Sequence, residues 1–202
     1  MGKLVIVKYN AGNIRSVYCA LKRLGLDATV SDDPSVLKGA SRIIFPGVGE
    51  AYSAMQYLRK THLDEVLIGL TQPFLGICLG MQLMCDLSDE RSTECLGMYQ
   101  VPVRKFSADD AIKIPHMGWN TLQFGTDPLF AGIDRDSWVY FVHSYYVPTV
   151  PQTIASCTYG STTFSAALGE RNFRGVQFHP EKSGNTGAQI LENFIHLKED
   201  AL

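Results

Sequence analysis

Two kinds of segment alternate along the first half of the chain. Short apolar runs, which we expect to be strands, lie at residues 3–7, 28–31, 42–45 and 74–77. Apolar residues that recur every three or four positions predict helices at residues 14–24, 50–60 and 79–87. Strands that are separated by helices form a parallel sheet with helices on both faces. The alternation therefore predicts an α/β fold.

Residues typical of helix ends stand where this pattern needs them. Asn13 can cap the helix that begins at residue 14, and Gly25 can end it. Asp33-Pro34 is typical of an N-cap that is followed by proline at the first helical position, so we expect a further helix there.

The second half of the chain is richer in aromatic and β-branched runs. Residues 138–142, 153–156 and 173–178 predict further strands, some of them antiparallel. A closing helix has an apolar face made of Ile190, Leu191, Phe194 and Ile195. With no repeat or linker, we expect residues 1–202 to form one domain. Its mixed, mostly parallel central sheet is flanked by helices, with antiparallel strands in the second half.

Composition excludes several classes of protein. The net charge is −2, so no broad positive field attracts nucleic acid. The longest nearly apolar run, residues 74–85, is shorter than the roughly 18–20 residues that span a bilayer. The N-terminus carries no signal-peptide pattern, and the five cysteines form no C-x-x-C motif. We expect a reduced, cytoplasmic protein without a metal or cofactor, and without a membrane or nucleic-acid partner.

Cys78 occupies a strand-to-helix corner. Gly76 and Gly80 flank it at two residues on either side, as in the G-x-S-x-G turn that exposes a nucleophilic serine. Such a corner lifts the sulfur out of the sheet and places it at a helix N-terminus, where a thiolate is favoured. The backbone N–H of Leu79 then points to where an oxyanion would form. The alternative is a buried core thiol beside packing glycines, which is our interpretation of Cys85.

A thiolate nucleophile needs a base, and His179 has the most suitable surroundings. A strand ends at His179, since Pro180 cannot donate to a sheet ladder. Glu181 follows two residues later, and in extended backbone its side chain projects to the same side. Its carboxylate could then orient the imidazole. The alternative is a strand-end histidine beside a solvated glutamate.

Four other histidines are present. His62 and His196 fall in segments that we expect to be helical and solvent-facing. His116 and His143 have aromatic or glycine-rich neighbours and remain possible bases.

A glycine-rich turn follows the third predicted strand. Gly47, Val48 and Gly49 come directly after Pro46, and their N–H groups could complete an oxyanion hole. The Lys-[Ser/Thr] pair of a phosphate-binding loop is missing. Alone, this turn is a weak signal.

Taken together and in this order, the motifs at residues 46–49, 76–82 and 179–181 resemble those of the class I (triad) glutamine amidotransferases. The resemblance implies that Cys78 attacks the side-chain amide of glutamine, His179 transfers the proton and Glu181 orients His179. It further implies a set of oxyanion and substrate residues: Gly47, Val48, Gly49, Leu79, Gln82, Ser144 and Tyr145.

Three further blocks, Tyr9–Asn13, Pro115–Asn120 and the extension of H-P-E into Lys182-Ser183-Gly184, narrow the resemblance. They are typical of family members that pass ammonia to a (β/α)₈ cyclase subunit in histidine biosynthesis, as one half of a heterodimer. Lys8 departs from the pattern, since an acidic residue is expected there. The resemblance implies an interface with the cyclase near Asn10, Asn13, Met117, Trp119 and Lys182. Their alternative interpretation is plain surface.

Other functions fit parts of this pattern. Another triad amidotransferase, serving anthranilate, pyridoxal phosphate or GMP synthesis, would share the cysteine corner and the H-P-E motif. A stand-alone cysteine hydrolase would need no partner. A regulatory subunit that has lost catalysis would not need Cys78, His179 and Glu181, which are all present here.

Overall fold

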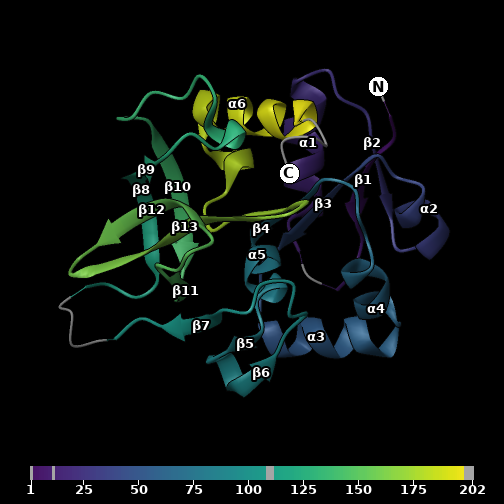
Figure 1. Cartoon of the computed structure of the whole chain (residues 1–202), viewed down its shortest axis with the longest axis horizontal. Helices are drawn as coiled ribbons and strands as arrows, with labels where there is room; N and C mark the ends of the chain where they lie inside the picture. Colours follow the sequence, from purple (N-terminus) through teal and green to yellow (C-terminus); the bar gives the residue numbers. More distant parts are fainter. Residues whose placement is uncertain (1, 11, 108–111, 198–202) are drawn as a thin grey trace.

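The structure is a computed structural model of the chain, and it describes residues 2–10, 12–107 and 112–197 (Figure 1). The N-terminal half builds the parallel part of a large sheet, in the order β2-β1-β3-β4-β14. These strands are β1 (Leu4–Val7), β2 (Ala28–Ser31), β3 (Arg42–Gly47), β4 (Phe74–Cys78) and β14 (Phe173–Val176). Among all the residues that the structure describes, no helix is long and apolar enough to cross a membrane.

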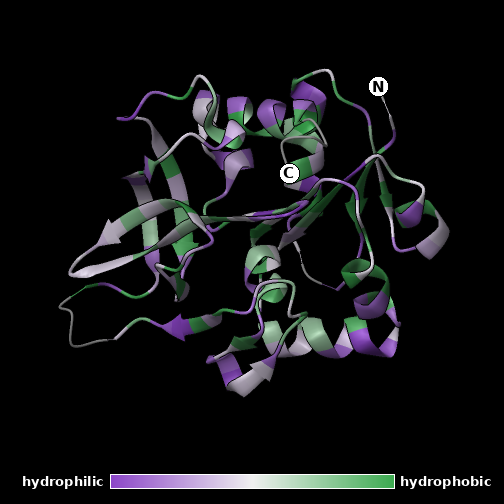
Figure 2. Cartoon of the chain, viewed as in Figure 1, coloured by the Kyte–Doolittle hydropathy of each residue, from purple (hydrophilic) through white to green (hydrophobic). Residues whose placement is uncertain are grey.

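Helices cover both faces of the parallel strands. They are α1 (Ile14–Arg23), α2 (Pro34–Lys38), α3 (Ala51–Lys60), α4 (Leu63–Ile68), α5 (Leu79–Met84) and α6 (Gly184–His196). Figure 1 shows α1 and α6 on one side of the sheet and α3, α4 and α5 on the other. The apolar residues are concentrated in the strands between these two layers (Figure 2).

Two apolar cores result, one on each face of the sheet. Successive residues of β1 alternate between them, so Val5 packs toward α3 and α4 while Ile6 packs toward α1 and α6. The predicted apolar face of the last helix is confirmed: Ile190, Leu191 and Phe194 are fully or almost fully buried in the second core.

Antiparallel strands extend the sheet in the second half of the chain. They are β7 (Pro102–Lys105), β9 (Gln123–Phe124), β11 (Tyr145–Pro148), β12 (Thr153–Tyr159) and β13 (Thr162–Glu170). At one edge, β5 (Leu87–Ser88) pairs with β7 in parallel and with β6 (Thr93–Glu94) in antiparallel orientation. A separate ribbon pairs β8 (His116–Thr121) with β10 (Trp138–His143). The predicted fold, a single α/β domain with a mostly parallel centre and added antiparallel strands, is confirmed.

Several local predictions differ from the structure. The helix predicted at 79–87 ends at Met84, because the backbone N–H groups of Leu96, Gly97 and Tyr99 bond the carbonyls at its end. The strand predicted at 173–178 ends at Val176. Helix α4 is not anticipated by the sequence analysis at all.

The two predicted helix caps have different outcomes. Asp33 caps α2 as expected, since its carboxylate accepts from the N–H groups of Ser35 and Val36. Asn13 is the N-terminal flanking residue of α1, but its side chain makes no capping bond. Its amide instead contacts Glu181.

Candidate active site

Cys78 stands at the corner between β4 and α5. Its backbone has φ 54° and ψ −110°, a conformation with positive φ that non-glycine residues rarely adopt. The two flanking glycines are required by packing. A Cβ on Gly80 would collide with the carbonyl oxygen of Phe45, and one on Gly76 would lie 2.8 Å from the nitrogen of Met81. Glycine at both positions therefore lets the strand, the corner and the helix approach each other.

His179 and Glu181 form a buried pair just beyond the end of β14. Nδ1 of His179 lies 2.7 Å from Oε1 of Glu181, and neither side chain is exposed. Because a carboxylate oxygen accepts, the hydrogen is on Nδ1. The other ring nitrogen, Nε2, is buried and has no hydrogen-bond partner among the described residues. It is therefore the nitrogen that is free to exchange a proton.

The electrostatic surroundings of His179 favour its charged form. Burial alone would lower its pKa, but electrostatic attraction to Cys78 and the bond to Glu181 outweigh burial and raise the pKa to about 10. A hydrogen-bonding interaction with Cys78 also contributes to this rise in pKa, although its geometry leaves Nε2 of His179 without an aligned partner among the described residues. The Sγ atom lies 3.9 Å from the carbonyl oxygen of Val142 and 3.7 Å from Nε2 of Gln177.

A cavity of about 300 Å³ opens beside Cys78. Six of the seven predicted oxyanion and substrate residues line it: Val48, Gly49, Leu79, Gln82, Ser144 and Tyr145. Gly47 does not line it. It pairs with Cys78 in the register of β3 and β4, and a Cβ on it would meet the hydroxyl of Tyr9.

Glu90 also lines this cavity, and the sequence analysis does not anticipate it. Its Oε2 accepts a hydrogen bond of 2.7 Å from the N–H of Ala51. Burial, together with the nearby charge of Glu50, raises its pKa even though this hydrogen bond acts in the other direction. No motif signals it, because it lies on an irregular turn after β5.

The predicted role of Gln82 meets a constraint in the structure. Its Nε2 donates to the carbonyl oxygen of Tyr145 and to Oε1 of Gln177, both at 2.9 Å. Both amide hydrogens are thus in use. Only Oε1 remains for a substrate, as an acceptor.

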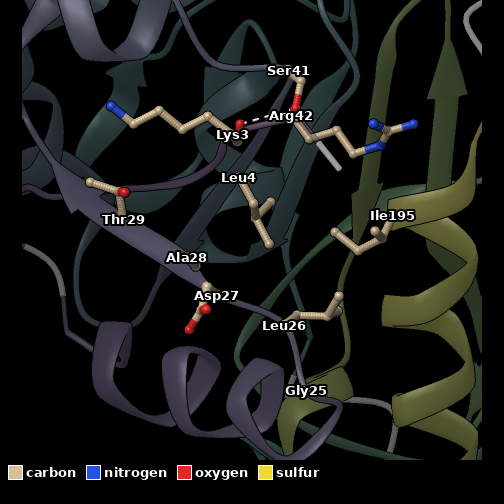
Figure 3. Close-up of a pocket in the computed structure, with 11 residues that line it drawn as sticks. Lys3, Leu4, Gly25, Leu26, Asp27, Ala28, Thr29, Ser41, Arg42 and Ile195 are labelled. Atoms are coloured by element: carbon tan, nitrogen blue, oxygen red, sulfur yellow. Dashed lines mark hydrogen bonds between the residues drawn. The ribbon is translucent and has the colours of Figure 1, made fainter.

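A larger cavity, of about 480 Å³, lies at the opposite end of the parallel strands (Figure 3). Lys3, Asp27 and Arg42 are at its rim, and the guanidinium of Arg42 bonds the carbonyl oxygens of Phe194 and Leu197. None of its lining residues is a cysteine or histidine. The smaller cavity, which holds the cysteine, is therefore the candidate active site.

The remaining histidines have different surroundings. His62 and His196 are exposed, as expected. His116 and His143 are buried and bond each other at 3.0 Å. Burial lowers the pKa of His116 to about 4 and that of His143 to about 3. Both ring nitrogens of His143 are occupied, since its Nδ1 lies 2.8 Å from the carbonyl oxygen of Tyr145. Their lowered pKa values make both residues weaker bases than His179.

Four of the five residues predicted at a partner interface are on the surface. Met117 and Trp119 are 65% and 50% exposed on β8, beside Trp138 of β10, which is 55% exposed. Lys182 is exposed, with its ammonium 5.8 Å from the ring of Tyr140. Asn10 is exposed and donates to the carbonyl oxygen of Ser53.

Asn13, the fifth, is only partly exposed and reaches the candidate triad. Its Nδ2 donates to Oε1 of Glu181, the same oxygen that His179 contacts, and lies 3.5 Å from Nδ1 of His179. This contact explains why its side chain does not cap α1.

Comparisons with known proteins match nearly the whole chain to one family. The family model of the class I glutamine amidotransferases matches residues 6–197. The imidazole glycerol phosphate synthase subunit HisH of Bacteroides fragilis is 52% identical over 96% of this chain and its own full length. The HisH subunit of Shewanella sediminis is 46% identical over 98% of this chain and 92% of its own.

Solved structures show the same fold at lower identity. A putative GMP synthase subunit from Thermoplasma acidophilum has a TM-score of 0.73 at 21% identity, covering 96% of this chain and 93% of its own. A structure described as a glutamine amidotransferase has a TM-score of 0.74 at 17% identity, covering 96% of this chain and 97% of its own.

Proposed function

This chain belongs to the class I glutamine amidotransferase family, and on that premise we propose that it is the glutaminase subunit of an imidazole glycerol phosphate synthase. It hydrolyses glutamine to glutamate and ammonia. The ammonia passes to a (β/α)₈ cyclase subunit that makes imidazole glycerol phosphate and aminoimidazole carboxamide ribotide in histidine biosynthesis. The observation that carries this proposal is the 52% identity with a HisH subunit over that protein's whole length.

The first half of the proposed reaction forms a thioester. The sulfur of Cys78 attacks the side-chain amide carbon of glutamine, and the amide oxygen takes the negative charge. The raised pKa of His179 lets its ring hold the proton that the thiol gives up. That proton then goes to the leaving nitrogen, so the C–N bond breaks and ammonia departs. The contact between Glu181 and Nδ1 keeps Nε2 directed to this transfer.

The second half releases glutamate. Water attacks the thioester carbon while Nε2 of His179 takes a proton from it, and the C–S bond then breaks. In both halves the N–H of Leu79 and one from the turn at Gly47–Gly49 stabilise the oxyanion. Loss of one such donor typically lowers the rate by about 10²–10³-fold.

Two acceptors in the cavity suit the amino-acid end of glutamine. Oε1 of Gln82 is its free polar atom, and the carboxylate of Glu90 lines the same cavity. Both can accept from the α-ammonium group of the substrate. Ser144 and Tyr145 line the same cavity.

An exposed apolar patch supports docking of the cyclase. Met117, Trp119 and Trp138 form it on the ribbon of β8 and β10, and this ribbon also contributes Val142 to the cavity wall. Exposed patches of this kind mark protein interfaces. A sealed interface keeps ammonia unprotonated, since ammonia loses its nucleophilicity when bulk water protonates it. Asn10, Asn13 and Lys182 border the same region in the proposal.

A cytoplasmic location is part of the proposal. All five cysteines lie in the described part of the chain, and none of them is in a disulfide. A reducing compartment maintains thiols in this state.

The experiment is Cys78→Ala, assayed together with the cyclase subunit. We expect glutamine-dependent product to be lost while added ammonium salt still supports cyclisation. Cys19→Ala, at an exposed thiol on α1, is the matched control and should keep both activities. Persistence of glutamine-dependent product in Cys78→Ala would refute the mechanism. Ammonia transfer to an anthranilate, pyridoxal phosphate or GMP synthase, but not to the cyclase, would reassign the partner.

A further inference from the structure

Gln177 touches the reacting sulfur but has no place in the mechanism above. Its side chain is fully buried, and it lies between the end of β14 and His179. Nε2 of Gln177 is 3.7 Å from Sγ of Cys78, and its Oε1 is 2.9 Å from Nε2 of Gln82. Burying an amide without hydrogen bonds is energetically costly, so both ends of the Gln177 amide need a partner.

The carbonyl oxygen of Tyr145 determines which end of each amide faces which partner. A carbonyl only accepts, so the atom of Gln82 that lies 2.9 Å from it is the amide nitrogen. The same nitrogen faces Gln177, and the Gln177 atom that receives it is therefore the oxygen. The NH₂ end of Gln177 is left to face Cys78.

The same carbonyl also determines the tautomers of two histidines. Because Nδ1 of His143 contacts Tyr145 O at 2.8 Å, the hydrogen of His143 is on Nδ1. Burial lowers the pKa of His143 to about 3, so its ring is neutral near pH 7 and Nε2 is an acceptor. It accepts from Nδ1 of His116 at 3.0 Å. One buried chain of fixed polarity thus extends from His116 to the sulfur.

We propose that Gln177 donates an N–H to the sulfur of Cys78 and stabilises its thiolate form, held in this orientation by Gln82 and the Tyr145 carbonyl. A hydrogen bond to an ionised group is roughly twice as strong as one between neutral groups, so the donor favours thiolate over thiol. The carbonyl of Val142, 3.9 Å from the sulfur, can accept only from the thiol. Gln177 therefore replaces the contact that the sulfur loses on ionisation.

This inference rests on the proposed function only in taking Cys78 as the nucleophile. The same donor acts in both halves of the reaction. It stabilises the sulfur before attack, and again when the C–S bond breaks and the electron pair returns to sulfur. Gln177 acts on the thiolate directly, as a hydrogen-bond donor, and does not exchange a proton.

The test measures the reactivity of Cys78 without glutamine. The whole chain is alkylated with iodoacetamide between about pH 5 and about pH 10, and mass spectrometry follows the peptide that contains Cys78. Only the thiolate reacts, so the profile gives its apparent pKa. Gln177→Met keeps the length of the side chain and removes the donor. We expect the apparent pKa to rise by about one to two units, a ten- to hundredfold smaller thiolate fraction at a pH below it.

Two further variants keep the result interpretable. Gln177→Glu retains an acceptor for Gln82 but places a carboxylate beside the sulfur, so we expect a larger rise than in Gln177→Met. Gln82→Met frees the Gln177 amide to rotate, and we expect a smaller rise. Gln72→Met is the matched control, since Gln72 is a half-buried amide that bonds the carbonyl of Leu37 outside the active site. Its alkylation profile should equal that of the wild type.

A role in folding alone would lower stability and leave the profile unchanged. An unchanged alkylation profile in any of the three site variants that folds cooperatively overturns the inference. The proposed function fails separately, if the wild type gives no glutamine-dependent product with the cyclase. In that case a shifted profile in Gln177→Met still upholds the role of Gln177.

Discussion

The molecule holds two buried histidine sites, His179 beside Glu181 and the bonded pair of His116 and His143, and they have opposite electrostatics. At His179, attraction to Cys78 and the bond to Glu181 overcome burial and raise the pKa to about 10. At His116 and His143, no carboxylate among the described residues is a bonding partner, and burial lowers the pKa values to about 4 and about 3. Burial alone makes a histidine neutral, whereas burial beside an anion makes it charged.

The two sites are therefore suited to different chemical roles. His179 has one ring nitrogen held by Glu181 and one without an aligned partner among the residues that the structure describes, which suits proton transfer. His143 has both nitrogens occupied, which suits a fixed tautomer in a hydrogen-bonded chain. The sequence leaves three histidines open as the base, and this geometry favours His179.

Glu181→Gln should reduce the difference in pKa between His179 and the two neutral histidines, His116 and His143. Without the carboxylate, the pKa of His179 falls and the ring loses the partner that fixes its tautomer. We expect glutamine-dependent product formation with the cyclase to fall by about 10³–10⁴-fold, with ammonium-dependent cyclisation unchanged. Glu192→Gln on α6 is the control and should keep full activity. A loss smaller than about tenfold in Glu181→Gln would contradict the assigned role.

The pH dependence of stability should differ in sign between the sites. Because the pKa of His179 is raised above its ordinary 6.5, its contribution is complete below pH 6.5 and is lost as the pH rises toward about 10. The pKa of His143 is lowered, so its contribution is complete above pH 6.5 and is lost as the pH falls toward about 3.

Urea unfolding across the pH range checks both signs. In Glu181→Gln, the unfolding free energy should decrease less as the pH rises toward about 10. In His116→Phe, it should decrease less as the pH falls toward about 3. If Glu181→Gln changed the stability only at acid pH and His116→Phe only at alkaline pH, the assigned signs would be wrong.

His143→Leu should lower the stability of the protein, because it breaks the bonded pair of His116 and His143, and it leaves the catalytic base in place. It leaves Nδ1 of His116 without its partner and leaves Tyr145 O with only the donor of Gln82. An unpaired buried donor costs about 1–3 kcal/mol, so we expect the free energy of unfolding in urea to fall by that amount. His196→Leu, at an exposed position at the end of α6, should change it by less than about 0.5 kcal/mol. Equal stability of the two variants would contradict the hydrogen-bonded chain.

The sequence could predict those parts of the molecule that depend on local pattern. The strands and most helices follow from periodicity, and the corner at Cys78 follows from glycines whose absent side chains allow a close approach. The proximity of His179 and Glu181 follows from their spacing of two residues. Each of these features is contained in a short stretch of chain.

The parts that could not be predicted depend on contacts between distant segments. Asn13 has the pattern of a helix cap, but its amide bonds Glu181, which is 168 residues away. Gln177 gives no signal in sequence, because its donor direction is set by Gln82 and a backbone carbonyl on β11. Helix α5 ends early because a later loop bonds its carbonyls. Local propensity contains none of this information.

The smallest expected effect concerns the aromatic rings that pack against His116. The ring of Tyr159 stacks on His116 with centroids 4.0 Å apart, and Phe141 is stacked at 4.8 Å. Tyr159→Leu should lower the unfolding free energy by about 1 kcal/mol, the usual value of an aromatic pair. It also opens His116 to water, so the pKa of His116 measured by NMR titration should rise toward its ordinary value.

Tyr159→Phe separates the ring from the hydroxyl. It keeps the stacking and removes only the hydrogen bond of 2.8 Å that the hydroxyl donates to the carbonyl of Lys113. Its pKa for His116 should therefore remain low, close to that of the wild type. If Tyr159→Leu and Tyr159→Phe shifted that pKa equally, the hydroxyl rather than the aromatic ring would be what keeps His116 neutral. The contrast with His179 would then depend on a polar contact at the surface and not on burial.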